Sequence, residues 1–273
     1  MIKDVVVNLS RGQDFAADYA ISLGAAFGAH LVGISFVYDP VIPDGTMGGL
    51  PVDLIEAQRN ENSREARSAA ERFEASARAA GIAVETRLID ASVGGAATRF
   101  GEIARRFDLA VVGQAQRDHI ASEDLTIEAA LFESGRPVVV VPYIQKQGLK
   151  LDRVIVGWDG SRTAARAIGD AMPFLERAGA VEVMVVAEER KRDEIPGASV
   201  IAHLSRHGIA ATLRQTTKGD ISIENVILSY AADNAADFLV MGGYGHSRLR
   251  EFILGGVTRG ILSSMTLPVL MSH

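Results

Sequence analysis

Two glycine clusters near the end of the chain have the residue types of a phosphate-binding site. The sequence reads LVMGGYGHSRLREFILGGVTRGI over residues 239–261, and its first apolar run ends at Met241. Glycine permits positive φ and lets a ligand approach the backbone closely. The second cluster precedes a predicted helix, where unpaired N–H groups and the helix dipole favour an anion. The pattern predicts two facing glycine-lined walls around a polyphosphate.

Polar side chains beside these glycines are further candidate contacts. Thr258 adds a hydroxyl at the start of the last helix, and His246 either reaches a phosphate or points to water. Asp159 follows an apolar strand of the same half, where it contacts a base, a sugar or a bound Mg²⁺, or else caps the next helix. Arg248, Arg250 and Arg259 are interpreted as a solvated face from which one side chain can touch phosphate.

Composition narrows the classes of function. The 273 residues contain no cysteine, which excludes disulfides, thiolate metal sites and a cysteine nucleophile. A formal net charge of −6 argues against a general nucleic-acid binder. No apolar run approaches the about 18 residues of a membrane span, and the N-terminal MIKDVVVNLSRG does not resemble a signal peptide. A cytoplasmic protein that acts away from membranes and nucleic acid is expected.

The chain repeats itself, which indicates a duplicated domain. KDVVVNLSRGQDFAADYAISL at 3–23 parallels DRVIVGWDGSRTAARAIGDAM at 152–172, and FDLAVVG at 107–113 parallels DFLVMGG at 237–243. The order of the repeated motifs is the same in both halves. We therefore predict domains at 1–143 and 151–273, with the polar YIQKQGLK at 143–150 as the linker.

Short β-branched runs alternate with amphipathic stretches in both halves. Strands are predicted at 5–7, 31–37, 84–88, 109–112 and 138–141, with helices between them that include a long one at 53–80. The second half repeats this alternation from 154 to 271. Such alternation implies parallel pairing through right-handed crossovers. Each half is predicted to be a doubly wound, five-stranded α/β unit, in which ligands bind beyond the carboxyl ends of the strands.

The glycine spacing G-x-x-G-x₉-G, formed by Gly242, Gly245 and Gly255 and followed by GVT, resembles the motif of the universal stress protein family. VIVGWDGS on the first strand of this half and the ending TLPVL are similar to that family as well. The resemblance covers the chain as two tandem domains and is stronger in the second. It implies a Rossmann-like (HUP-like) fold of strand order 3-2-1-4-5, an ATP ligand with Mg²⁺, and a role in the stress response. ADP and AMP stay open as alternative ligands.

By position, the resemblance assigns the phosphates and ribose to the glycine motif and the adenine end to Asp159 and the backbone around Val186. The nucleotide-binding residues predicted in this way are Asp159, Val186, Met241, Gly242, Gly245, His246, Gly255, Gly256, Val257 and Thr258. The family usually has Ser or Thr where this chain has Gly256, so one hydroxyl is missing. That loss is worth about 1 kcal/mol, or somewhat more toward a charged acceptor.

The first half departs from the motif. Gly113 matches the first glycine, but Gln116 replaces the second, and DLTIEAAL, with Asp124 and Glu128, replaces the third. Ser10 stands where Asp159 stands in the second half. Carboxylates repel phosphate, so the first domain is predicted to be a degenerate copy without nucleotide binding.

The fifth strands, PVVVVP and PVLMS, would be exposed apolar edges if each domain stood alone. The resemblance implies that they pair antiparallel across a pseudo-two-fold axis, within one chain. Association into a homodimer stays open.

Three functions remain open at this point. The first is an ATP-binding stress-response regulator with at most slow ATP hydrolysis or self-phosphorylation at Thr258 or a nearby serine, since no general base or nucleophile lies beside the glycines in the sequence. The second is an adenylating enzyme, although GWDGSRT lacks the double glycine of a pyrophosphate loop. The third is a nucleotide-free interaction module.

Trp158 is interpreted as a packing residue. His203 and His207 are interpreted as a solvated helix end rather than a metal site.

Overall fold

A computed structural model describes residues 1–10, 12–40, 51–115, 120–187, 197–244 and 256–273. The elements of the first half are β1 (Asp4–Asn8), α1 (Asp14–Phe27), β2 (His30–Tyr38), α2 (Val52–Ala79), β3 (Val84–Ala91), α3 (Ala96–Ala104), β4 (Leu109–Gly113), α4 (Ile120–Glu133) and β5 (Val138–Val141). Those of the second half are β6 (Arg153–Gly157), α5 (Arg162–Leu175), β7 (Ala180–Ala187), α6 (Ala198–Arg206), β8 (Ala211–Thr217), α7 (Ile223–Asp233), β9 (Phe238–Gly242), α8 (Gly256–Ser264) and β10 (Val269–Ser272).

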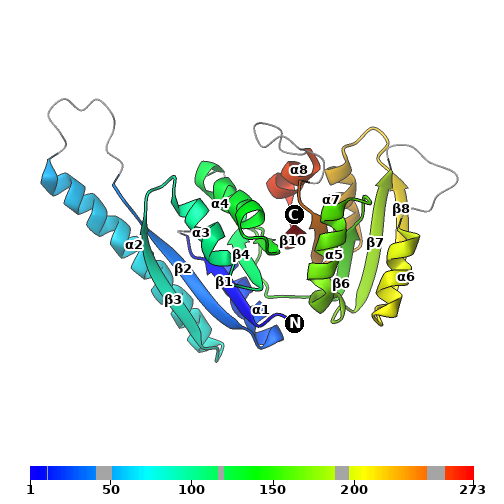
Figure 1. Cartoon of the computed structure of the whole chain (residues 1–273), viewed down its shortest axis with the longest axis horizontal. Coiled ribbons are helices and arrows are strands. Elements are labelled where there is room, and N and C mark those ends of the chain that lie inside the picture. The colour runs from blue at the N-terminus through cyan, green and yellow to red at the C-terminus, as the bar shows by residue number, and fades with distance from the viewer. Residues whose placement is uncertain (11, 41–50, 116–119, 188–196, 245–255) are drawn as a thin grey trace.

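The strands form one ten-stranded sheet in the order β3-β2-β1-β4-β5-β10-β9-β6-β7-β8. Within each half the pairing is parallel and the order is 3-2-1-4-5, as the resemblance implied. The halves join where β5 and β10 pair antiparallel, with Val140 opposite Val269 and Val139 opposite Leu270. The predicted α/β fold and the pairing of the fifth strands are confirmed, and Figure 1 shows the halves side by side about this seam.

Helices cover both faces of the sheet because the strands are apolar on both sides. One face packs against buried residues of α1, α2, α5 and α6, and the other packs against buried residues of α3, α4, α7 and α8. The side chains alternate between the faces along each strand, so Val240 faces the first layer and Met241 the second. This alternation decides which helices the residues at the strand ends can contact.

Local sequence sets where several helices begin and end. Ser161 caps α5, because its hydroxyl accepts the Ala164 N–H at 3.1 Å. Helix α1 ends at Gly28, whose φ of 61° lies in the left-handed region that glycine adopts without strain. The predicted helix at 53–80 is α2, displaced by one residue at each end.

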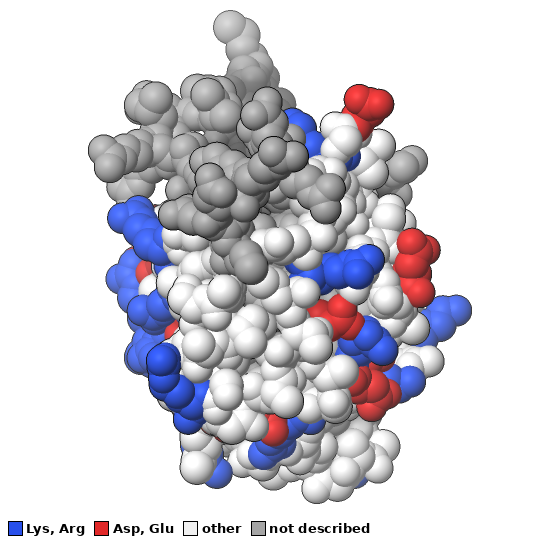
Figure 2. Space-filling model, turned by 90° about the vertical axis from the view of Figure 1, so that its right-hand side faces the viewer, with Lys and Arg blue, Asp and Glu red and all other residues white. Residues whose placement is uncertain are grey.

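Among the residues that the structure describes, no helix is long and apolar enough to span a membrane. Figure 2 shows the face on the side of the second half, where basic and acidic side chains border an uncharged area and neither sign covers the face.

Candidate functional site

The candidate site lies at the carboxyl edge of the second half. Parallel strands β6, β7 and β9 end there, at Gly157, Ala187 and Gly242. The ladders place Val156 beside Val240, so the chain leaves β6 and β9 at neighbouring positions. The residues after each strand, which include Asp159 and the first glycine cluster, are therefore brought to one rim, as open α/β sheets bring their ligand-binding residues together.

The described parts of the glycine segment are two flanks, residues 242–244 and residues 256–259. A hydrogen bond joins them, because the Tyr244 N–H donates to Thr258 Oγ1 at 3.1 Å. Thr258 is 4% exposed and Tyr244 is 6% exposed, so water does not compete for this bond. The Thr258 hydroxyl was expected at the phosphates. Its oxygen accepts a backbone N–H at the base of the segment, and accepting this bond does not use its own O–H donor.

Gly242 and Gly243 are required by close packing rather than by their backbone angles. Neither has a positive φ, contrary to the expectation for these turn positions. A Cβ on Gly242 would lie 2.6 Å from both the Ala164 backbone N and Thr163 Oγ1, at the start of α5. A Cβ on Gly243 would lie 2.7 Å from Leu131 Cδ2, on α4 of the first half. The first cluster therefore allows two helices to approach the end of β9.

The left-handed residue of this turn is Tyr244, with φ of 54°. The sequence did not predict this positive φ, because tyrosine is not a residue type that indicates it. Its ring lies 4.9 Å from that of Phe132 on α4, in a tilted arrangement, and Phe132 in turn lies 4.7 Å from the ring of His273. Burial, with Glu128 and Asp124 adding to it, raises the pKa of the Tyr244 hydroxyl well above its ordinary range. The aromatic contact holds the first flank against the other half.

The second flank starts α8 with an open position. Gly256 is exposed, and a Cβ added to it would meet no atom of the described residues within 4 Å. Val257 is partly buried against the helical layer that contains α8. The described residues leave room at Gly256 for an anion to approach the backbone N–H groups at the start of α8.

Asp159 lies in the turn between β6 and α5. Its Oδ1 accepts the Ser161 N–H at 2.9 Å, and Ser161 rather than Asp159 is the N-cap of α5. The alternative that Asp159 caps the helix is therefore wrong in detail: Asp159 shapes the turn before the cap. The residue is exposed at the rim.

Val186 and Met241 are on the same side of the sheet as α8. Val186 is partly buried near the end of β7, and Met241 is 6% exposed near the end of β9. Trp158 packs partly buried against the opposite helical layer, as its interpretation as a packing residue predicted. Gly245, His246 and Gly255 lie outside the described residues.

The corresponding rim of the first half is filled by its own side chains. Asn8 Nδ2 donates to Ser10 Oγ at 2.9 Å, where the second half has Asp159. A Cβ on Gly113 would lie 2.6 Å from Oε1 of Gln13, which is 2% exposed. Gln114, also buried, donates from Nε2 to the Leu262 carbonyl of α8 at 2.8 Å. No glycine-lined approach to a ligand is found among these described residues.

The carboxylates of α4 interact electrostatically with side chains of the second half. Burial raises the pKa of Asp124, and the Arg259 guanidinium of α8 opposes that rise. Burial and the neighbouring Asp124 raise the pKa of Glu128. Both carboxylates therefore act electrostatically on groups of the second half.

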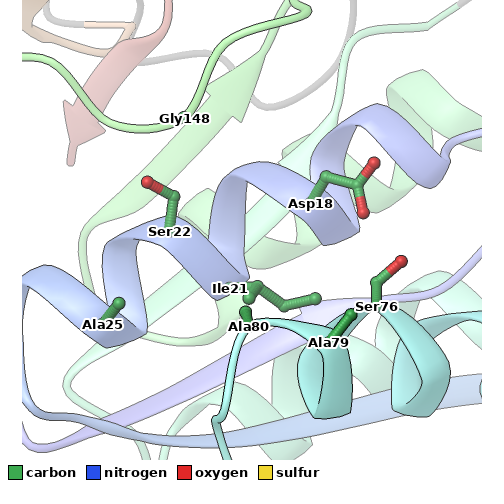
Figure 3. A pocket seen from close by; sticks show the side chains of 8 residues that line it. All are labelled: Asp18, Ile21, Ser22, Ala25, Ser76, Ala79, Ala80 and Gly148. Atoms are coloured by element: carbon green, nitrogen blue, oxygen red, sulfur yellow. The ribbon is translucent and has the colours of Figure 1, made fainter.

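Other candidate features lie away from this rim. The rings of His203 and His207 meet at 4.7 Å between centroids, yet the described residues contain no group of three or more His, Asp or Glu side chains that could hold a metal ion. A groove of 580 Å³ lies between α1, α2 and the linker, lined by Asp18, Ile21, Ser22, Ala25, Ser76, Ala79, Ala80 and Gly148 (Figure 3). Its alanines come from the C-terminal parts of both helices, which run back toward the amino edge of the sheet.

Residues 150–273 match the model of the universal stress protein family. A universal stress protein of Synechocystis sp. is 45% identical over 47 residues, which are 17% of this chain and 16% of that relative. The structure of a universal stress protein from Archaeoglobus fulgidus covers 98% of this chain and 97% of its own, with a TM-score of 0.73 and 17% identity. At that identity the likeness shows the fold.

A universal stress protein solved in complex with cAMP matches 51% of this chain and 97% of its own, with 21% identity and a TM-score of 0.35. The cAMP ligand belongs to that protein. The family model covers the half of the chain that holds the glycine motif, and the whole-chain structural match has the same fold. Residues 150–273 of this chain therefore belong to the universal stress protein family.

Proposed function

We propose that the second half binds an adenine nucleotide at its carboxyl rim and that the protein acts through this binding as a stress-response regulator. The observation that carries the proposal is the hydrogen bond from Tyr244 N–H to Thr258 Oγ1, which holds the two flanks of the glycine motif together at the strand ends. The motif spacing and the free start of α8 support an anionic ligand at this position.

Each candidate residue has a part in the proposal. The backbone of Gly242, Gly245, Gly255, Gly256 and Val257 encloses the phosphates and ribose, His246 lies within this segment, and Thr258 acts as the tie that shapes it. Asp159, Met241 and the backbone near Val186 border the adenine end. ATP with Mg²⁺ is the first candidate ligand, and ADP and AMP are tested beside it.

The first half, residues 1–143, is proposed to be a second, degenerate domain of the same family. Its topology repeats that of the second half strand by strand, while Ser10 and Gln114 stand where the second half has Asp159 and Gly243. We expect no nucleotide in its cleft. Its task would be to complete the shared sheet and to support the second half.

The test is the nucleotide content of the purified protein, followed by calorimetric titration with ATP and Mg²⁺. We expect close to one nucleotide per chain, and loss of binding in Gly245→Glu, because a carboxylate would enter the phosphate segment. The matched control is Gln116→Glu, the equivalent position of the first half, which should bind as the wild type does. If the purified protein contains no nucleotide and millimolar ATP produces no heat, the proposal is rejected and a nucleotide-free interaction module is favoured.

A further inference from the structure

The two outer strands of the sheet, β3 and β8, are each paired on one side only among the described residues. Figure 1 shows them on opposite sides of the molecule. An outer strand offers a row of backbone N–H and C=O groups to another chain, and proteins usually protect such an edge with charged side chains. The charges on the two edges differ, and the difference determines which edge can accept a second copy of this chain.

The backbone groups of every second residue of β3 point away from the sheet. The N–H of Asp39, directly after β2, donates to the Ala91 carbonyl at 3.0 Å, so the backbone groups of Ala91 point toward β2. Because residues alternate in direction along a paired strand, the odd-numbered residues of β3 bond to β2 and the even-numbered residues face outward. Thr86 and Leu88 are therefore among the residues that offer both backbone groups to a further strand.

The two charged side chains on either side of Thr86 lie on the exposed face of β3. The Thr86 hydroxyl donates to Glu74 of α2, so the neighbouring side chains of Glu85 and Arg87 point to the face opposite that helix. Arg87 Nε donates to Glu85 Oε1 at 2.8 Å, and the two side chains stay 42% and 47% exposed. Opposite charges thus stand two residues apart on an open strand.

We propose that β3 is a docking edge for a second copy of this chain, paired antiparallel about a two-fold axis at Thr86. In this register Thr86 faces Thr86 of the second copy as a hydrogen-bonded pair. Glu85 lies opposite Arg87 of the second copy, in a non-hydrogen-bonded pair where side chains are closest. Opposite charges directly across two strands stabilise their pairing. Val84 faces Leu88 of the second copy, whose side chain is 44% exposed in the single chain.

Other arrangements lack this complementarity. A two-fold axis at Glu85 or at Arg87 would place like charges opposite each other, which destabilises the pairing. The equivalent strand β8, with the sequence ATLRQTT, has Thr212 in place of Glu85 and Arg214 in place of Arg87. Strand β8 therefore contains no carboxylate that could oppose its arginine. The charge pattern of β3 fits a second β3 and protects against other edges.

The test uses two single variants, each alone and both mixed. Glu85→Arg makes both positions basic, and Arg87→Glu makes both positions acidic, so each variant alone would place like charges across the two-fold axis. In sedimentation equilibrium at low salt, the wild type should form a reversible dimer, and each variant should associate at least about tenfold more weakly. An equimolar mixture should recover the association, because a basic strand then faces an acidic one. The control Arg214→Glu, on β8, should associate as the wild type does.

Cysteine cross-linking tests the register, because the chain has no cysteine of its own. Thr86→Cys should form a disulfide-linked dimer, since the Cα atoms of a hydrogen-bonded pair lie about 5.5 Å apart, within the range of a disulfide. Leu88→Cys should not, because the two-fold axis at Thr86 places these residues about 13 Å apart along the strands.

Four results would overturn this inference, and none of them depends on nucleotide binding. The first is a wild type that stays monomeric up to its highest soluble concentration, and the second is a mixture that associates no better than the single variants. The third is cross-linking of Leu88→Cys in preference to Thr86→Cys. The fourth is growth beyond the dimer, which would mean that β3 pairs with β8 of the next copy.

Discussion

The two halves have the same strand order, but different residue types follow the strands at their carboxyl edges. Gln114 and Gly243 both follow the last residue of the fourth strand, and each contacts a leucine of the other half. Gln114 donates to the Leu262 carbonyl, while Gly243 packs against Leu131. Both leucines stand seven residues before their fifth strand. Equivalent contacts between the halves are thus made twice, once by the polar side chain of Gln114 and once by Gly243, which has no side chain.

The helices that follow show the same contrast. Ile127 on α4 and Thr258 on α8 are equivalent by their distance from the fifth strand, and so are Glu128 and Arg259. Ile127 is buried at 1% exposure as a core residue, whereas Thr258 binds the Tyr244 N–H. A shared fold therefore does not carry the site with it. A few substitutions at the rim separate a candidate binding half from a supporting half.

Alanine substitutions at the equivalent glycines Gly113 and Gly242 are expected to give the largest difference in the free energy of unfolding. We predict that Gly242→Ala lowers the free energy of unfolding by about 1–3 kcal/mol, because its Cβ would meet the backbone of α5. Gly113→Ala should cost less, since its Cβ meets the end of the Gln13 side chain. That side chain has no hydrogen-bond partner for its amide in the described part of the chain, so it can move cheaply. Urea unfolding measures both, and equal costs would contradict this account.

Thr258→Val tests the tie between the flanks. Valine keeps the shape of threonine but leaves the buried Tyr244 N–H without its acceptor, so we expect a loss of about 1–3 kcal/mol in the free energy of unfolding and weaker nucleotide binding. Thr258→Ser keeps the hydroxyl and should preserve binding. If the valine variant bound nucleotide as the wild type does, the hydrogen bond would have no part in shaping the site.

Periodicity predicted the α/β class from sequence, and the family resemblance implied the strand order. The β-branched runs and the repeat located the strands and the duplication, because burial on both faces imposes apolar composition whatever the neighbours are. The pairing of β5 with β10 was implied by the family resemblance, and the two apolar edges gave a physical reason for it.

The site was harder to predict because its details depend on contacts between the halves. Gly243 was predicted as a turn glycine. The structure shows that Leu131, far away in sequence, leaves no space for a Cβ at this position. Thr258 was predicted as a ligand contact, and the sequence did not show that its hydroxyl accepts a buried backbone N–H. Tyr244 gave no signal at all. Short-range patterns carry no information on which distant side chain will occupy the neighbouring space.

Gly256→Ser tests whether the second half binds ATP more tightly when it regains the hydroxyl that the family usually has at this position. The position is open among the described residues, so the serine displaces none of them. We expect ATP to bind about three to ten times more tightly, through one hydrogen bond to a charged oxygen. Gly256→Ala is the control, because it changes the helix start equally and adds no hydroxyl. Titration calorimetry on both variants separates the two effects, and a gain in the alanine variant would refute the role of the hydroxyl.

The smallest expected effect concerns the charge that α4 brings to the boundary. Burial, followed by Asp124, raises the pKa of Glu128 in the folded chain. The folded state therefore holds its proton at higher pH than the unfolded state, and this stabilisation is full below about pH 4 and lost as pH rises through the folded pKa. Glu128→Gln should flatten that part of the pH profile.

The change should amount to a few tenths of a kcal/mol, because Glu128 is only partly buried and water screens it. Urea unfolding between about pH 4 and 7 measures it, with Glu133→Gln as the control for removing a charge from the same helix. The sign distinguishes two views of the boundary. If Glu128→Gln instead lowers stability at neutral pH, then Glu128 is held by a favourable pairing with the second half, and α4 attracts rather than repels across the seam.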